Sequence, residues 1–201
     1  MATFTKDLAN NYFKRNPKFK TKHSTLILSD FLKNETLDNI FEIGCHTGVQ
    51  LFYLTIDKGR KGHGMDISPE AIVAGKNKYK DLNLKVGKCP DDFDGMIKDN
   101  SMDLIHVGFC FYVMSDTEVE ETLRIALKKL KPGKFLSIEE FDTVNVSQCP
   151  RDGITIYKRD YSNIGGFKLL EKKVFYDEAG LNNISYDNEK DRYSLWLFKK
   201  K

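Results

Sequence analysis

Short apolar runs alternate along the chain with longer stretches in which apolar residues recur at helical spacing. Each apolar run has the length and composition of a buried strand, and the runs cover residues 39–44, 61–67, 83–87, 102–113 and 134–141. The intervening stretches, residues 47–59, 68–80 and 115–133, have the period of amphipathic helices. The fourth run is apolar enough to be buried on both faces, as the strands of a parallel sheet are.

Local signals mark the ends of these helices. Ser68 has the side chain of an N-cap, and Pro69 follows it at the first helical position. In residues 115–133 acidic side chains come early and basic side chains late, which matches the helix dipole, and Pro132-Gly133 predicts the end of the helix. Strand and helix in regular alternation predict an α/β fold with a doubly wound, parallel sheet.

The alternation stops after the fifth run. We expect residues 142–166 to form an irregular insertion on the substrate side, and residues 167–176 and 192–200 to form two late strands. Residues 1–35 precede the sheet as a helical cap of one or two helices, with Pro17 as the break. The whole chain, 1–201, has the length of a single domain.

Composition narrows the class of protein. Hydrophobic residues make up 40% and charged residues 30% of the chain, as in soluble globular proteins, and a net charge of +3 does not by itself argue for nucleic acid. With no apolar run of about 18 residues and no signal-peptide pattern, we expect a cytoplasmic protein with no membrane partner. The cysteines and histidines lack the spacing of zinc ligands or of a disulfide framework, so we expect no metal.

The segment 40–50, "IFEIGCHTGVQ", places a glycine turn after the first strand. A dinucleotide-binding turn needs G-x-G-x-x-G, but His46 occupies the middle position and no third glycine follows; a P-loop would need G-K-[ST]. A ligand without phosphates, such as S-adenosylmethionine, tolerates this turn, and histidine is among the residue types enriched at positive φ. The alternative is an ordinary strand-to-helix turn.

Asp66 ends the second run, on the carboxyl side of the sheet where Gly44 also lies. A carboxylate at this distance from the glycine turn can accept hydrogen bonds from both ribose hydroxyls, and the neighbouring Ile67 can pack on an adenine ring. The alternative for Asp66 is a local role in the turn or the helix cap. Glycine turn and acid together favour a nucleoside-containing cofactor.

Taken in order, "FEIGCHTGVQ", "GHGMDIS", "VGKCPDDF", "NSMDLIHVGFCFYV" and "LKKLKPGKFLSIEEFD" resemble the motifs of the class I S-adenosylmethionine-dependent methyltransferases. The resemblance covers residues 40–142 and extends to "YKRDYS", which is similar to a segment of a bacterial, small-molecule branch of these enzymes. It implies a mostly parallel, seven-stranded Rossmann-like sheet flanked by helices, with the last strand antiparallel. It also implies S-adenosylmethionine as cofactor and S-adenosylhomocysteine as product.

The resemblance also assigns cofactor contacts. The methionine part would lie against the glycine turn, the ribose at Asp66 and the adenine near Cys89. The residues implied to bind the cofactor are Glu42, Gly44, Cys45, His46, Gly48, Asp66, Ile67, Cys89, Asp91, Gly108 and Phe109. Lys88 stands where many members of the class have an acid.

Methyl transfer from a sulfonium is an in-line displacement, so the protein mainly has to position the acceptor and exclude water, and a base is needed only if the acceptor loses a proton. Our candidates for catalysis are Glu139, Tyr112 and Tyr157. Our candidates for substrate contact are Tyr112, Asp142, Arg159 and Tyr161, with arginine suited to an anionic acceptor. His106, inside the fourth run, is expected to be a core histidine.

Little of the chain lies outside the sheet, which favours a small-molecule acceptor over a protein or a structured RNA. A nucleic-acid methyltransferase is the alternative enzyme, although "GFCFYV" has neither an [ND]-P-P-[YF] tetrad nor a Pro-Cys nucleophile. A catalytically inactive protein that binds S-adenosylmethionine and a nicotinamide dehydrogenase are further alternatives. The sequence leaves the oligomeric state open.

Overall fold

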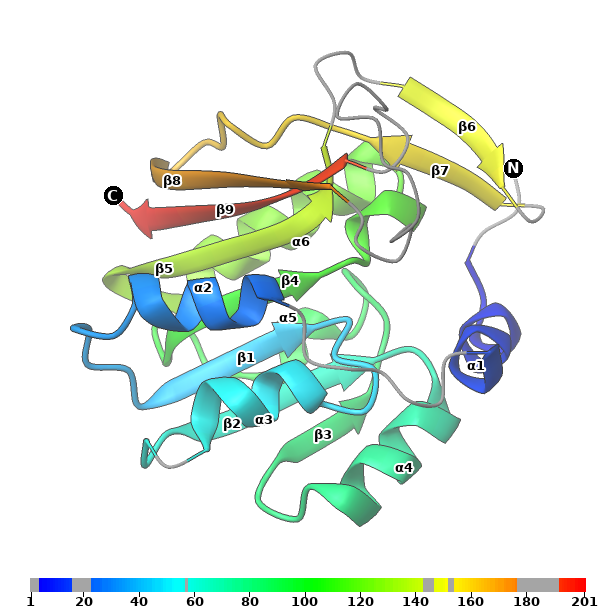
Figure 1. Cartoon of the computed structure of the whole chain (residues 1–201), viewed down its shortest axis with the longest axis horizontal. Coiled ribbons are helices and arrows are strands. Elements are labelled where there is room, and N and C mark those ends of the chain that lie inside the picture. The colour runs from blue at the N-terminus through cyan, green and yellow to red at the C-terminus, as the bar shows by residue number, and fades with distance from the viewer. Residues whose placement is uncertain (1–3, 16–22, 57, 143–146, 152–153, 177–191) are drawn as a thin grey trace.

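The computed structural model describes residues 4–15, 23–56, 58–142, 147–151, 154–176 and 192–201 (Figure 1). Its main feature is a seven-stranded sheet with the strand order β3-β2-β1-β4-β5-β9-β8. The strands are β1 Asn39–Ile43, β2 Lys61–Asp66, β3 Asn83–Val86, β4 Met102–Gly108, β5 Leu130–Phe141, β8 Phe167–Tyr176 and β9 Arg192–Lys200.

Strands β1 to β5 are parallel to one another, and β9 runs antiparallel between β5 and β8. The predicted doubly wound, mostly parallel sheet with an antiparallel last strand is therefore confirmed. The strand order reverses between β1 and β4, and in an open α/β sheet a ligand crevice opens at the carboxyl ends of the strands at such a point.

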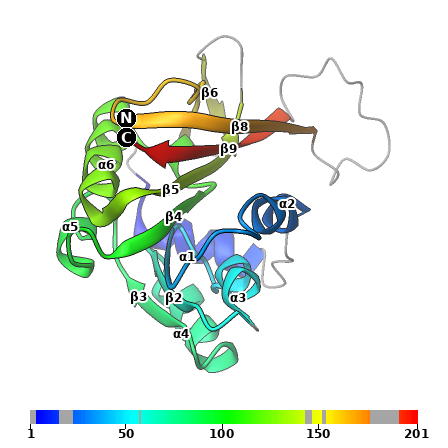
Figure 2. The same cartoon turned by 90° about the vertical axis from the view of Figure 1, so that its left-hand side faces the viewer.

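Helices cover both faces of the sheet. α2 and α3 lie on one face and α5 and α6 on the other, while α1 lies beyond the carboxyl ends of the strands (Figures 1 and 2). The helices are α1 Lys6–Arg15, α2 His23–Phe31, α3 Val49–Thr55, α4 Pro69–Lys78, α5 Phe93–Met96 and α6 Asp116–Lys129. Helices α1 and α2 fall within the predicted helical cap, and the predicted break at Pro17 lies outside the described residues.

The predicted helix starts agree with the structure. Ser68 caps α4 by accepting a hydrogen bond from the Ala71 N–H at 3.1 Å, with Pro69 at the first position. Ser115 caps α6 in a capping box, because its side chain accepts from the N–H of Glu118 while the Glu118 carboxylate accepts from the N–H of Ser115. These side chains satisfy N–H groups that have no partner within the helix.

Three predicted boundaries were wrong. β4 ends at Gly108 and a 3₁₀ helix, η1 Phe111–Val113, follows, because Phe109 adopts a φ of 49° that a strand does not allow. α6 ends at Lys129, where Leu130 takes extended angles, so Pro132-Gly133 lies inside β5. The segment 142–166 is not irregular throughout, since β6 Ser147–Arg151 and β7 Ile154–Lys158 pair as an antiparallel hairpin.

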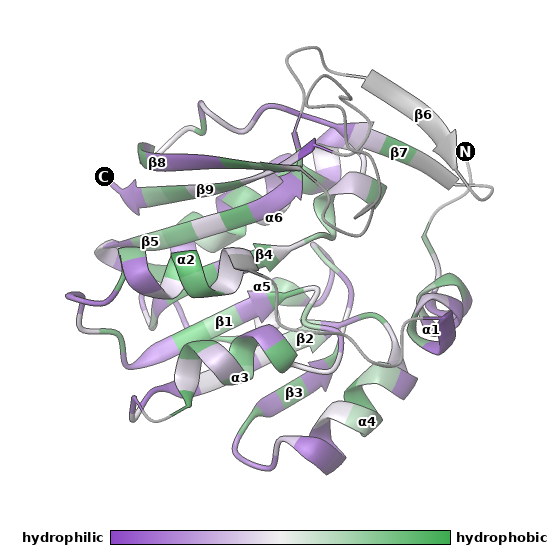
Figure 3. Ribbon diagram, viewed as in Figure 1, coloured by the Kyte–Doolittle hydropathy of each residue, from purple (hydrophilic) through white to green (hydrophobic). Residues whose placement is uncertain are grey.

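Two hydrophobic clusters, one on each face of the sheet, form the core. Strand β9 contributes to both, with Trp196 and Phe198 in one cluster and Leu195 and Leu197 in the other, since successive side chains of a strand point to opposite faces. This explains why β9 reads as a nearly continuous apolar run. In Figure 3 hydrophobic residues follow the strands, whereas the carboxyl end of α4 is hydrophilic.

None of the helices formed by the described residues has the length and apolar character needed to span a bilayer.

Candidate functional site

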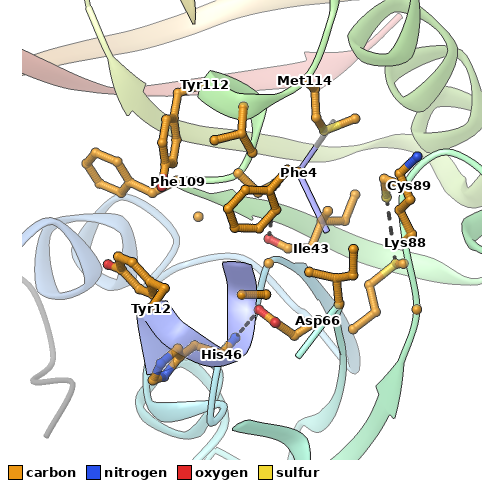
Figure 4. A pocket seen from close by; sticks show the side chains of 18 of the residues that line it. Phe4, Tyr12, Ile43, His46, Asp66, Lys88, Cys89, Phe109, Tyr112 and Met114 are labelled. Atoms are coloured by element: carbon orange, nitrogen blue, oxygen red, sulfur yellow. Dashed lines mark hydrogen bonds between the residues drawn. The ribbon is translucent and has the colours of Figure 1, made fainter. Parts of the chain in front are cut away.

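A pocket of about 120 Å³ opens at the carboxyl ends of β1, β2 and β4, where the strand order reverses. Its walls come from the turn after β1, the ends of β2 and β4, the segment after β3, η1 and helix α1. In Figure 4 Asp66 lies near the middle, Phe109, Tyr112 and Tyr12 at one end, and Lys88, Cys89 and Met114 at the other. The pocket is long and has chemically different ends.

The glycine turn forms the floor of the pocket. Gly44, His46 and Gly48 all have positive φ, of 74°, 51° and 79°. A Cβ on Gly44 would lie 2.8 Å from the Cβ of Cys110 and 3.2 Å from the carbonyl oxygen of Gly108, so β1 and β4 approach too closely there for a side chain. The turn is thus fixed both by its backbone angles and by its packing against β4.

Buried Glu42 holds the helix that follows this turn. Its Oε2 accepts a hydrogen bond from the N–H of Leu51 at 3.1 Å, in the first turn of α3. A carboxylate near a helix N-terminus is favoured by the unsatisfied N–H groups there. Glu42 and Gly48, the N-cap of α3, therefore shape the turn from behind and do not line the pocket, and Cys45 is likewise buried beside it.

Asp66 lies on the pocket wall with both oxygens held by backbone. Oδ2 accepts from the N–H of His46 at 2.8 Å, and Oδ1 accepts from the N–H of Ser68 at 2.8 Å. Burial raises the pKa of Asp66, and these two hydrogen bonds oppose the rise. A carboxylate offers about four lone-pair sites, so two remain for a ligand's hydroxyl groups.

The ring of His46 joins the turn to α1. It is buried, and it contacts Tyr12 edge-on at 6.0 Å and Phe13 at 5.3 Å between ring centroids. Burial lowers the pKa of His46 to about 4, so the imidazole is neutral at pH 7. His46 therefore fastens helix α1 across the pocket by aromatic packing and carries no charge into the pocket.

Two further contacts hold α1 in place. The Ser68 hydroxyl donates to Asn10 Oδ1 at 2.6 Å, and Lys14 pairs with Glu70 at 3.1 Å. Through these contacts α1 packs on α4, and Phe4, Ala9 and Tyr12 reach the pocket.

One end of the pocket is apolar and rich in sulfur. Met65, Cys89 and Met114 line it, and the thiol of Cys89 lies 3.7 Å from the sulfur of Met65. Burial raises the pKa of Cys89 to about 12, which keeps the thiol protonated. At the rim Lys88 lies 3.5 Å from Glu118 and 3.4 Å from exposed Asp91, so its charge is balanced.

The other end of the pocket is aromatic. Phe109 and Tyr112 line it after the end of β4, and Tyr12 lines it from α1. Gly108 lies between this end and the glycine turn, and behind it lies a buried polar network. In that network the ring nitrogens of His106 lie 2.8 Å from Ser137 Oγ and 3.2 Å from Gln50 Oε1, so His106 is a core histidine as expected.

Glu139, our first candidate for a general base, belongs to this network. Its Oε1 accepts from the hydroxyl of Ser24 in α2 at 2.8 Å, its Oε2 lies 4.0 Å from His106 Nε2, and it is fully buried. The pocket lining does not include it. The geometry places Glu139 behind the wall of the pocket.

The other candidates from the end of β5 and from residues 157–161 are also held elsewhere. Arg159 donates to the carbonyls of Phe111 at 2.9 Å and Met114 at 2.7 Å and to Asp116 at 2.7 Å, with Tyr157 beneath its guanidinium. It therefore clamps η1 to the start of α6.

Asp142 accepts from Arg192 and Ser194 and so ties β5 to β9. Tyr161 is buried against Phe111 and Trp196. Neither residue lines the pocket, and Arg159 and Tyr157 do not line it either.

The structure thus brings most of the predicted cofactor residues together and leaves most of the predicted acceptor residues outside. The predicted residues that line the pocket are Gly44, His46, Asp66, Ile67, Cys89, Gly108, Phe109 and Tyr112. The sequence analysis missed Met65, Met114 and Glu118, which also line the pocket, and no local motif marks these residues as ligand contacts.

The sheet order, the antiparallel β9 and a pocket built from a glycine turn and an acid at the end of β2 give the chain the fold of the class I S-adenosylmethionine-dependent methyltransferases. Residues 40–133, slightly less than half of the chain, match the family model described as "Methyltransferase domain", so this part of the chain is similar to that family.

Known proteins resemble the chain in sequence and in structure. "O-methyltransferase 3" of Dictyostelium discoideum is 26% identical over 116 residues, which are 54% of this chain and 26% of the relative, so the chain spans about a quarter of that relative's length.

Among solved structures, the Burkholderia thailandensis 1,6-didemethyltoxoflavin-N1-methyltransferase with bound 1,6-didemethyltoxoflavin and S-adenosylhomocysteine has a TM-score of 0.66 at 12% identity, covering 89% of this chain and 76% of that one. The [4+2]-cyclase SpnF has a TM-score of 0.69 at 12% identity, covering 100% and 97%. At such identities these likenesses concern the fold alone.

Proposed function

We propose that this protein transfers a methyl group from S-adenosylmethionine to a small-molecule acceptor by in-line displacement. The observation that supports this most strongly is Asp66, whose two oxygens are fixed by the N–H groups of His46 and Ser68 on the pocket wall. A carboxylate held this way presents its remaining lone pairs to two neighbouring hydroxyl groups, which is the pattern of a ribose.

The charges around the pocket fit this cofactor better than a phosphate-bearing one. The acidic side chains of the lining are Asp66 and Glu118, and its lysine, Lys88, is paired with Asp91 and Glu118. A diphosphate needs N–H groups and cations directed at it, whereas a ligand with a sulfonium and an ammonium group benefits from nearby carboxylates. S-Adenosylmethionine, when bound, supplies a methyl group already activated by the positive charge on sulfur.

In the proposed complex each part of this ligand contacts different residues of the pocket. Asp66 binds the ribose hydroxyls, Ile67 and Cys89 enclose the adenine at the apolar end, and the carbonyl of Gly108 accepts from the ammonium group. His46, through its contacts with α1, closes the pocket to water. Positioning and exclusion of water supply most of the rate enhancement that such a displacement needs.

Tyr112 is the catalytic candidate that the geometry favours. It lines the pocket at the aromatic end, whereas Glu139 and Tyr157 do not line it. In the proposed arrangement the phenol of Tyr112 hydrogen-bonds the acceptor atom and orients its lone pair towards the methyl group. A base other than solvent is needed only for an acceptor whose proton is hard to remove.

Helix α1 supports the choice of a small acceptor. Phe4, Ala9 and Tyr12 cover the pocket from the N-terminal side, which restricts the approach of a folded macromolecule. A nucleic-acid acceptor and a protein that binds the cofactor without turnover remain the alternatives, and SpnF illustrates that a relative of this fold carries the name of a cyclase.

Calorimetric titration with S-adenosylmethionine and S-adenosylhomocysteine tests the first half of the proposal, and transfer of labelled methyl groups into a metabolite extract tests the second. We expect both ligands to bind at one site and the label to enter small molecules. Absence of binding would refute the proposed methyltransferase activity. Label in RNA would favour a nucleic-acid acceptor, and binding with no labelled product would favour a protein that binds the cofactor without turnover.

A further inference from the structure

The aromatic end of the pocket continues into a cluster of rings that we call the aromatic shelf. It consists of Phe109, Tyr112, Phe141, Tyr193 and Phe175. Phe109 lies 5.4 Å from Phe141 and 5.5 Å from Tyr193 between ring centroids, and Tyr112 lies 5.4 Å from Phe141. Since Phe109 and Tyr112 also line the pocket, the shelf is continuous with it.

Three shelf residues form a row across neighbouring strands. Phe141 of β5 pairs with Tyr193 of β9, which pairs with Phe175 of β8, and directly opposed residues share a face of the sheet. Tyr193 and Phe175 are stacked at 5.1 Å. The row lies at the end of the strands, past Glu139 on the same face of β5.

The shelf rings are neither sealed in the core nor fully exposed. All of them are half-buried, whereas Trp196 and Phe198, further along β9, are completely buried. Phe109 adopts a φ of 49°, an unfavourable angle for a bulky residue, and its ring lies beside Tyr112 at the edge of the pocket (Figure 4). Half-buried rings beside a ligand pocket offer flat faces on which a planar ligand can stack.

The charged groups near the shelf favour some ligands over others. The carboxylates at the end of β5 are directed elsewhere: Glu139 to Ser24, Glu140 to the N–H of Phe111, and Asp142 to Arg192. The ammonium group of Lys158 lies over the ring of Phe141 at 6.0 Å. That face of the Phe141 ring is therefore already occupied by a cation and is not offered to a cationic acceptor.

We propose that the methyl acceptor is a planar aromatic molecule, neutral or anionic, that stacks on the aromatic shelf and presents a phenolic or heteroaromatic atom to the methyl group. This inference rests on the proposed function. In the transfer the acceptor atom forms a bond to the methyl carbon while the carbon–sulfur bond breaks. The electron pair of the broken bond stays on sulfur, and the proton of the acceptor atom leaves to water.

Matched probes test this inference on the full chain loaded with S-adenosylhomocysteine. 2-Naphthoate is planar and anionic, decahydro-2-naphthoate keeps the charge but not the flat rings, and 2-naphthylmethylamine keeps the rings but is cationic. We expect 2-naphthoate to bind about fivefold or more tighter than either of the others, from stacking in one case and charge in the other. Equal binding of the saturated acid would overturn the inference.

Variants connect the effect to the shelf. Phe141→Leu removes a shelf ring that does not line the cofactor pocket, and Phe52→Leu removes a half-buried ring that packs on Tyr79 in a different region. We expect the first to weaken 2-naphthoate about fivefold with unchanged S-adenosylhomocysteine affinity, and the second to change neither. Phe175→Leu serves if Phe141→Leu does not fold. Unchanged naphthoate binding in the folded shelf variant would refute the shelf as the acceptor site.

The charge argument has its own variant. Lys158→Gln should remove the preference for 2-naphthoate over the amine, and a preference that persists would exclude Lys158 as its cause. Titration with S-adenosylhomocysteine alone comes first. If that ligand does not bind, the proposed function is refuted. If it binds but the protein binds 2-naphthoate no more tightly than its saturated analogue, only the proposal of an aromatic acceptor is refuted.

Discussion

Replacing Asp66 by alanine tests how the pocket holds its cofactor. The substitution removes the acceptors of two backbone hydrogen bonds, from the N–H groups of His46 and Ser68, each 2.8 Å long. It also removes the proposed acceptors of two ribose hydroxyls. Hydrogen bonds to a charged group contribute about 1.5–3 kcal/mol each, and water replaces part of what is lost. We therefore expect affinity for S-adenosylhomocysteine to fall by about 1–3 kcal/mol, or roughly 5–150-fold.

A matched control separates ligand binding from folding. Asp103 is a buried carboxylate that likewise accepts two backbone N–H groups, from Asp38 and Asn39 at 3.0 Å each, and also pairs with Lys131, but it lies at the amino end of the strands. Asp103→Ala should lower the free energy of unfolding by about 1–3 kcal/mol or more, as Asp66→Ala should, yet leave affinity unchanged. Calorimetric titration and denaturant unfolding of both variants measure the two quantities.

The pH dependence provides a second measurement on Asp66. Burial raises its pKa, and a ribose prefers the ionised carboxylate. Wild-type affinity should therefore fall as the pH drops through a value above the ordinary 3.8, while affinity of Asp66→Ala should stay flat there. Full affinity in Asp66→Ala, or an equal loss of affinity in Asp103→Ala, would refute the placement of the ribose.

Three other predictions concern the same region. Gly44→Ala should destabilise the protein by more than the roughly 1 kcal/mol expected for Gly59→Ala, because both glycines have positive φ but only Gly44 would place a Cβ 2.8 Å from another side chain; equal Tm values would contradict this. His46 has a pKa of about 4 in the folded protein and of 6.5 in the unfolded chain, so the unfolded chain takes up the proton first as the pH falls. About 1–2 kcal/mol of the free energy of unfolding should therefore be lost between pH 7 and pH 5, and His46→Phe should abolish this loss in urea unfolding. Arg159→Ala should cost about 2–4 kcal/mol in the same assay because it removes the hydrogen bonds from Arg159 to the buried carbonyls of Phe111 and Met114, whereas Arg124→Ala, at an exposed ion pair, should have little effect; the reverse order would exclude the clamp.

The parts of the fold that were predictable depend on short-range chemistry. The cap Ser68, the glycine turn and the acid at the end of β2 are each marked by their own residue types and by their spacing along the chain, so the sequence indicates them directly. The ends of β4 and α6 were less predictable. Phe109 has a positive φ, which its bulky side chain does not indicate, and Pro132-Gly133 lies in β5 because Leu130 already leaves the helical angles.

The acceptor side shows the limit of the sequence most clearly. Glu139, Glu140 and Asp142 look alike as acids at the end of a strand. In the structure they are directed towards α2, towards η1 and towards Arg192, respectively, and none of them lines the pocket. Alternation predicts that neighbouring strand residues point to opposite faces of the sheet, but the groups that they contact on each face come from distant segments of the chain.

By itself the sequence determined the alternation of strands and helices up to β5, the two late strands, and the position of the glycine turn and of Asp66, because periodicity, capping and turn chemistry act over a few residues. Only the tertiary structure decided which groups surround the acceptor. Helix α1 reaches the pocket by packing on α4, and Arg159 binds the carbonyls of Phe111 and Met114. Rings from the segment after β4 and from β5, β8 and β9 meet in one shelf. These contacts join residues that are far apart in the chain, and the pairing of the strands determines which of those residues lie together.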